Sequence, residues 1–126
     1  MRDRAETIIL AEDEPLVRAM VVAVLRDQGY NVLETANGAE ALQVAQEHAV
    51  EEIQLLLSDI VMPRMNGIDL ARRFREMFPD TRILLMSGYA DEPDLRQALP
   101  DPTIEFLPKP FTPQELAEKL REVLDG

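Results

Sequence analysis

Five short apolar runs alternate along the chain with longer segments of helical periodicity, and this alternation most constrains the fold. We interpret as strands the runs near residues 7–11, 31–35, 53–58, 82–87 and 104–108. We interpret as helices the segments near residues 15–28, 38–48, 67–77, 91–99 and 113–124. This alternation is typical of βαβ units, in which parallel strands form one sheet covered by helices on both faces. The sequence therefore predicts an α/β fold.

The composition of the runs indicates the order of the strands. The first, third and fourth are nearly all apolar, as strands buried on both faces are, whereas the second and fifth include Glu34 and Glu105. Polar residues of this kind suit the edges of a sheet. We therefore predict a five-stranded parallel sheet of order 2-1-3-4-5, doubly wound as (βα)5. Because 126 residues with 46% hydrophobic content can bury one core, we predict a single domain over residues 1–126.

Capping-box spacing marks the starts of two helices. Asn37 is followed three residues later by Glu40, and Thr112 by Glu115. A side chain at the first position can accept a backbone hydrogen bond from the third helical residue, and the acidic side chain can return one. The two pairs therefore predict helix starts near 38 and 113.

The bulk composition excludes several kinds of protein. A formal charge of -11 and a pI near 4.4 argue against nucleic-acid binding within this chain, since such domains carry a clustered basic face. The absence of cysteine excludes a disulfide, a thiolate nucleophile and a cysteine-bound zinc, and it suits a reducing cytoplasm. The apolar runs are too short to span a membrane, so we expect a cytoplasmic domain without membrane contact.

Chemically active side chains stand where four of the predicted strands end. Glu12 and Asp13 follow the first strand and Asp59 follows the third, while Ser87 ends the fourth and Lys109 follows the fifth. In a parallel sheet these ends meet at one edge, at the crevice where the strand order reverses. Carboxylates without histidine or cysteine favour a hard cation such as magnesium (Mg2+), which also binds phosphate.

The same residues suit phosphoryl transfer. Asp59 can take phosphorus as an acyl phosphate, Lys109 can supply a compact positive charge, and Ser87 can donate a hydrogen bond to a phosphoryl group. Each residue alone has a simpler explanation: an acidic run can complement the positive end of a helix, and a lysine can be a solvated surface residue. Their coincidence at successive strand ends favours one shared site.

The motifs together resemble a known family. Glu12-Asp13, Asp59 followed by Met62-Pro63 and Asn66-Gly67, Ser87-Gly88, and Lys109-Pro110-Phe111 are similar to the receiver domain of two-component response regulators. The similarity is greatest to the C-terminal receivers of hybrid sensor histidine kinases. It implies a flavodoxin-like fold and a phosphorelay function, in which Asp59 accepts a phosphoryl group from a sensor histidine kinase or a histidine phosphotransfer domain.

The resemblance also implies a role for each site residue. Asp13, Asp59 and the backbone carbonyl of Val61 would bind Mg2+ directly, and Glu12 would act through water. Ser87 and Lys109 would contact the phosphoryl group, with a cis peptide bond between Lys109 and Pro110.

Three positions bear on switching and on the lifetime of the phosphorylated state. Phe106 matches the aromatic residue that moves inward when the hydroxyl is drawn to the phosphate, although many members have tyrosine there. Packing by Phe106 offers a second explanation for its presence. Val61 and Tyr89 would border the approach of water, and because neither orients water, we expect slow dephosphorylation.

Two other classes of protein remain as alternatives. A flavodoxin-like cofactor-binding module would share the fold, but its first loop would need glycines and hydroxyls where this chain is acidic. An aspartate-based phosphatase would need a second carboxylate at Val61. We therefore expect a switch that assists its own phosphorylation and dephosphorylation rather than a metabolic enzyme. Because the chain ends at Asp125-Gly126 after the last predicted helix, we also expect a hybrid-kinase receiver or a stand-alone one.

Overall fold

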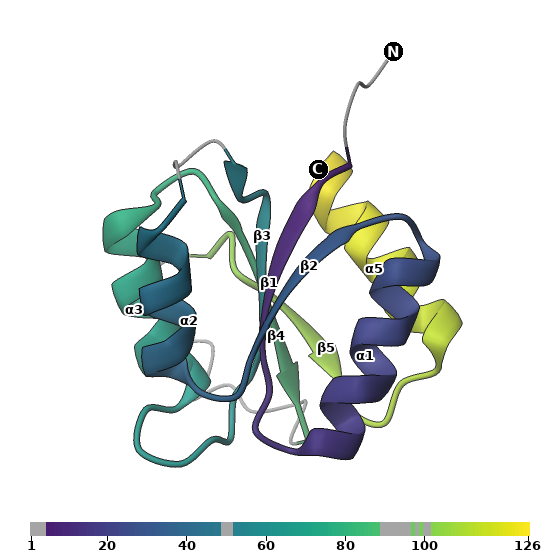
Figure 1. Cartoon of the computed structure of the whole chain (residues 1–126), viewed down its shortest axis with the longest axis horizontal. Coiled ribbons are helices and arrows are strands. Elements are labelled where there is room, and N and C mark those ends of the chain that lie inside the picture. Colours follow the sequence, from purple (N-terminus) through teal and green to yellow (C-terminus); the bar gives the residue numbers. More distant parts are fainter. Residues whose placement is uncertain (1–4, 49–51, 89–96, 98, 100–101) are drawn as a thin grey trace.

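A parallel sheet forms the centre of the computed structural model, which describes residues 5–48, 52–88, 97, 99 and 102–126 (Figure 1). The strands are β1 (Thr7–Ala11), β2 (Asn31–Thr35), β3 (Leu55–Asp59), β4 (Arg82–Ser87) and β5 (Glu105–Pro108). Their order is β2-β1-β3-β4-β5, and every neighbouring pair is parallel. The predicted sheet order and the placement of the two polar strands at its edges are confirmed.

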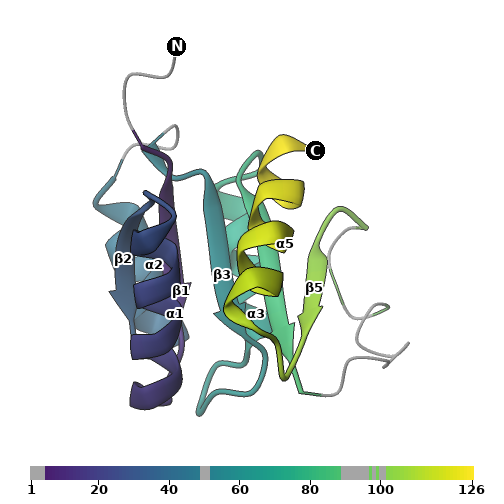
Figure 2. The same ribbon diagram turned by 90° about the vertical axis from the view of Figure 1, so that its right-hand side faces the viewer.

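Helices cover both faces of this sheet. The described helices are α1 (Pro15–Asp27), α2 (Gly38–Gln46), α3 (Gly67–Met77) and α5 (Pro113–Asp125). Helices α1 and α5 lie on one face, and α2 and α3 lie on the other (Figures 1 and 2). The helix predicted at 91–99 lies largely outside the described residues.

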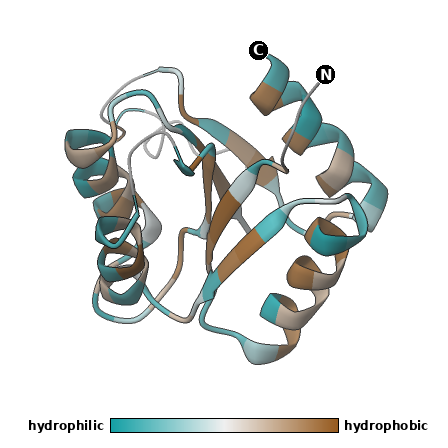
Figure 3. Ribbon diagram, turned by 45° about the horizontal axis from the view of Figure 1, so that its top comes forward, coloured by the Kyte–Doolittle hydropathy of each residue, from teal (hydrophilic) through white to brown (hydrophobic). Residues whose placement is uncertain are grey.

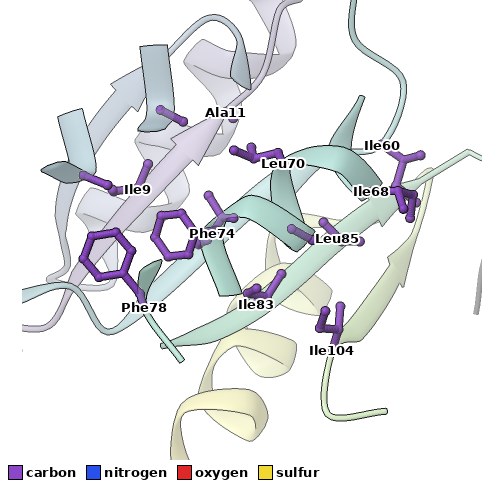
Figure 4. Packing of buried hydrophobic residues seen from close by; sticks show 14 of the residues in the cluster. Ile9, Ala11, Ile60, Ile68, Leu70, Phe74, Phe78, Ile83, Leu85 and Ile104 are labelled. Carbon is purple, nitrogen blue, oxygen red and sulfur yellow. The ribbon is translucent and has the colours of Figure 1, made fainter. Parts of the chain in front are cut away.

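Alternation along the strands divides the core into two layers. Ile8 and Leu10 of β1 pack with the α1 and α5 side, whereas Ile9 and Ala11 pack with the α2 and α3 side. This follows from the two-residue period of a strand, which sends successive side chains to opposite faces. In Figure 3 the central strands are largely in apolar colour, and the helices carry both apolar and polar colour. Figure 4 shows the layer under α3, where Phe74 is fully buried.

The helix starts follow the capping residues. Thr112 and Glu115 form the predicted capping box. Asn37 accepts a hydrogen bond from the N–H of Glu40 at 2.8 Å. The Glu40 carboxylate accepts from the N–H of Ala36 at 2.7 Å, and not from the N–H of Asn37 as in a capping box. Among the described helices, none has both the length and the apolar character needed to cross a membrane.

One strand differs from its predicted bounds in a way that concerns the site. The third strand was predicted at 53–58 and forms at Leu55–Asp59. It extends to Asp59 because this residue is paired with Met86 of β4, and the next N–H, that of Ile60, donates to the Met86 carbonyl at 3.0 Å. Asp59 is therefore held by the sheet itself.

Candidate functional site

The carboxyl ends of the strands meet at one edge of the sheet, where the arrowheads point in Figure 2. Glu12 and Asp13 follow β1, which lies next to β3, and Asp59 is the last residue of β3. Ser87 ends β4, and Lys109 follows β5. Residues that are distant in the sequence thus come to one edge, as the parallel arrangement predicts.

Three carboxylates form the centre of the site. Glu12, Asp13 and Asp59 each offer an oxygen, and these atoms lie within 4.8 Å of one another. The side chain of Glu12 is fully buried and Asp59 is only 7% exposed, so two of the three charges lie largely out of water. A compact set of oxygen ligands fits a hard divalent cation such as Mg2+.

The surroundings of one Glu12 oxygen support the binding of a cation at this site. Glu12 Oε1 is buried and has no hydrogen-bond partner among the described residues. Lys109 Nζ lies 3.6 Å from this oxygen, within ion-pair range but too far for a hydrogen bond. A buried carboxylate oxygen left in this state is costly, and a hydrated cation would supply the missing contact.

The backbone around Glu12 is fixed on both sides. Its N–H donates to the Thr35 carbonyl of β2 at 3.1 Å, and its carbonyl accepts from Arg18 Nη1 of α1 at 2.8 Å. Glu12 Oε2 accepts from the N–H of Glu14 at 3.1 Å. Sequence analysis did not identify Arg18 or Thr35, because neither residue stands next to the acidic pair in the sequence.

Burial changes the acidity of Glu12. Desolvation raises the pKa of its carboxyl, and the hydrogen bond from Glu14 opposes this effect. The negative charge of Asp59 raises the pKa further, and the positive charge of Lys109 lowers it. The charged form of Glu12 is therefore less favourable than it would be in water, and a nearby cation would favour it.

Lys109 reaches the acidic residues from the far side of β3. Its Nζ lies 3.1 Å from Asp59 Oδ2, and its backbone N–H donates to the Ser87 carbonyl at 2.7 Å. The peptide bond between Lys109 and Pro110 is cis, as predicted. The lysine side chain is 27% exposed, so it remains partly in contact with solvent while it pairs with the carboxylates.

The segment after Asp59 connects β3 to α3. Val61 is 63% exposed, and Asn66 caps α3 by accepting from the N–H of Asp69 at 2.9 Å. The N–H of Gly67 donates to the Ile60 carbonyl at 2.8 Å, which closes this loop against the end of β3. Sequence analysis placed Gly67 in a motif but gave it no role of its own.

The remaining predicted residues either lie beside the three carboxylates or fall outside the described residues. Ser87 is 2% exposed at the end of β4. Phe106 of β5 is half-buried and packs against the core layer under α2 and α3. Tyr89, predicted to border the path of water, lies outside the described residues.

Comparison with known proteins gives consistent matches over almost the whole chain. A family model for the response regulator receiver domain matches residues 8–121. The sensor kinase CckA of Brucella abortus (strain 2308) is 40% identical over 119 residues, which cover 94% of this chain and 12% of that protein. The response regulator receiver protein CpdR of the same strain is 41% identical over 123 residues, which cover 93% of this chain and 95% of that protein.

Solved structures agree with these matches. The crystal structure of the receiver domain from the hybrid histidine kinase CckA superposes with a TM-score of 0.78 at 36% identity. The superposition covers 94% of this chain and 98% of that receiver domain. The chain thus corresponds to a small part of one relative and to nearly all of another.

Proposed function

The chain belongs to the response regulator receiver family of two-component signalling, and from this we propose that Asp59 is a phosphoacceptor in a phosphorelay. The supporting observation is the position of Asp59 at the end of β3, within 4.8 Å of two other carboxylates and 3.1 Å from Lys109 Nζ. This arrangement combines a nucleophile, a set of cation ligands and a fixed positive charge.

The proposed reaction is transfer from a phosphohistidine. A carboxylate oxygen of Asp59 attacks phosphorus, the O–P bond forms as the P–N bond breaks, and the imidazole nitrogen keeps the electron pair. Lys109 faces the oxygens of the acceptor and offsets the charge that gathers there. The pairing of β3 with β4 holds the acceptor in place before the donor arrives.

We propose that Mg2+ is the cofactor of this reaction. Asp13, Asp59 and the carbonyl of Val61 would hold the ion directly, and Glu12 would hold it through water. When bound, the ion would neutralise phosphoryl oxygens. The unpartnered oxygen of buried Glu12 and the oxygen-only set of ligands support this assignment.

The phosphorylated state would act as a switch and not as a step of metabolism. In this proposal the Ser87 hydroxyl turns towards the phosphoryl group, and Phe106 follows it inward. Both residues lie on neighbouring strands, since β4 pairs with β5. The change would alter the affinity of the surface around β4 and β5 for a partner.

The phosphoryl donor would be a protein with a phosphorylated histidine, either a sensor histidine kinase or a histidine phosphotransfer domain. Two large apolar side chains support a protein donor: Leu16 on the first turn of α1 is 84% exposed, and Val61 is 63% exposed. Both follow closely on site residues in the sequence, so a docking protein could cover them while reaching Asp59.

We further propose that residues 1–126 form a single receiver domain that acts in the cytoplasm. CckA and CpdR, the two relatives described above, are the basis for two proposed origins, a part of a hybrid kinase or a stand-alone receiver. The alternative of a flavodoxin-like cofactor module finds no support in the site, because the loop after β1 presents the carboxylates of Glu12 and Asp13 where a phosphate-bearing cofactor would need hydrogen-bond donors.

The proposal is tested by phosphorylating the protein with acetyl phosphate and Mg2+ and measuring its mass. The wild type and Asp80→Asn should gain a phosphoryl group, because Asp80 is an exposed carboxylate just before β4, at the opposite edge of the sheet. Asp59→Asn should gain none. Equal incorporation in Asp59→Asn and the wild type would refute the assignment.

A further inference from the structure

The first residue of α3, Gly67, lies against the backbone that carries the proposed phosphoacceptor. A β-carbon at Gly67 would overlap the carbonyl oxygen of Asp59, and it would lie 2.8 Å from Cα of Ile60 and 3.1 Å from the carbonyl carbon of Asp59. All three are backbone atoms, so none can rotate aside as the end of a side chain could. Helix α3 can approach β3 this closely only because its first residue has no side chain.

The need for glycine here is steric and not conformational. Among the described glycines, only Gly29 has a positive φ, so the backbone of Gly67 adopts angles that other residues also adopt. The N–H of Gly67 donates to the Ile60 carbonyl at 2.8 Å, and the N–H of Ile60 donates to Met86 of β4 at 3.0 Å. The backbone after Asp59 is therefore held between β4 and the start of α3.

From this contact we infer that Gly67 is a positioning residue for the phosphoacceptor, an inference that rests on the proposed function of Asp59. A side chain at Gly67 would push residues 59–60 away from α3. The displacement would move the Asp59 carboxylate and the Val61 carbonyl relative to Glu12 and Asp13. Gly67 thus sets the spacing of the proposed Mg2+ ligands without contacting the ion or the phosphoryl group.

The chain contains a matched control for this inference. Gly38 is the first residue of α2 and follows the cap Asn37, just as Gly67 follows the cap Asn66. A β-carbon at Gly38 would meet Sδ of Met65 at 2.7 Å, its Cγ at 3.2 Å and its Cβ at 3.3 Å. Sδ and Cγ belong to a half-buried side chain and can move aside when it changes rotamer, and the contact with Cβ needs a shift of a few tenths of an ångström. Gly38→Ala therefore makes the same change at the same helical position, but against a side chain and not against the backbone of Asp59 and Ile60.

A second control separates placement from stability. Asn66→Ala removes the hydrogen bond that caps α3, which typically costs about 1 kcal/mol, but it adds no atom between α3 and β3. It should lower the unfolding temperature and leave Mg2+ affinity unchanged.

The test is a titration with Mg2+, followed through backbone amide NMR shifts, of the wild type, Gly67→Ala, Gly38→Ala and Asn66→Ala. The Mg2+ dissociation constant of Gly67→Ala should rise by about tenfold or more, as it does when residues behind metal ligands are changed. Its metal-free amide shifts should differ from the wild type at residues 59–61. Gly38→Ala and Asn66→Ala should bind Mg2+ as the wild type does.

The outcomes distinguish this inference from the proposed function. A wild type that takes no phosphate from acetyl phosphate refutes the role of Asp59. A phosphorylated wild type together with unchanged Mg2+ affinity in Gly67→Ala refutes the positioning role alone. If Gly67→Ala is unfolded in buffer, all four proteins are titrated in trimethylamine N-oxide, which favours compact states. A variant still unfolded there also overturns the inference, because Gly67 would then be required for folding as a whole.

Discussion

Neutralising one carboxylate of the site should stabilise the protein when Mg2+ is absent. Asp13 offers an oxygen within 4.8 Å of oxygens from Glu12 and Asp59. Among the described residues, the ion pairs within the site join Lys109 to Glu12 and Asp59 and do not include Asp13. Asp13→Asn therefore removes repulsion without removing one of those ion pairs.

The size of the effect follows from the distance. Two unit charges 4.8 Å apart repel by about 3.5 kcal/mol at an effective dielectric constant of about 20, and Asp13 has two such neighbours. Asp13 is partly exposed, so solvent screening reduces this to a net gain of about 1–2 kcal/mol. For a domain of 126 residues, that gain corresponds to a rise in Tm of about 3–8 °C.

The assay is thermal and urea unfolding in EDTA at low salt, followed by far-ultraviolet circular dichroism. Glu14→Gln is the control, because it makes the same change in the formal charge of -11 one residue away and is not part of the carboxylate cluster. The wild type should gain about 1.4 kcal/mol when Mg2+ is added at ten times its dissociation constant, and Asp13→Asn should gain much less at that concentration. The reasoning fails if, in EDTA, Asp13→Asn is not more stable than the wild type or is not more stable than Glu14→Gln.

Two further predictions concern single residues of the site. Burial raises the pKa of Glu12 above its ordinary value of 4.5, so the folded protein binds the proton of this carboxyl more tightly than the unfolded chain does. This tighter binding stabilises the fold fully below about pH 4.5. The stabilisation is lost as the pH rises through the pKa of Glu12 in the folded protein. In EDTA, urea unfolding should therefore show the wild type losing stability relative to Glu12→Gln from about pH 4.5 towards neutral pH, and a pH-independent difference between them would contradict this. Val61 is 63% exposed beside the proposed acceptor and cannot orient water, so Val61→Asn should lose its phosphoryl group faster than the wild type at matched Mg2+. Phosphate release after removal of acetyl phosphate measures this rate, and an unchanged or slower rate would show that Val61 does not limit the approach of water.

The amino-acid sequence was enough to predict the sheet and the edge at which the site lies. Hydrophobic periodicity is a local property, so five apolar runs separated by helical patterns indicate their elements without knowledge of the tertiary structure. The polar residues Glu34 and Glu105 indicated the edge strands, and the parallel arrangement then placed residues that follow strands, such as Asp59 and Lys109, at a common edge. Each of these inferences uses only the order of residue types along the chain.

Distances between elements, by contrast, were decided only by the tertiary structure. Glu12 and Asp13 are neighbours in the sequence, yet Glu12 is fully buried and Asp13 is partly exposed, and contacts with β2 and α1 fix the backbone of Glu12. Likewise, the letters around Gly67 indicate a helix start, but they do not show that the helix begins against the Asp59 carbonyl. Sequence patterns report which face of an element is apolar, whereas the spacing of packed elements depends on how all their side chains fit together. That spacing decides which carboxylate is buried and which glycine admits no side chain.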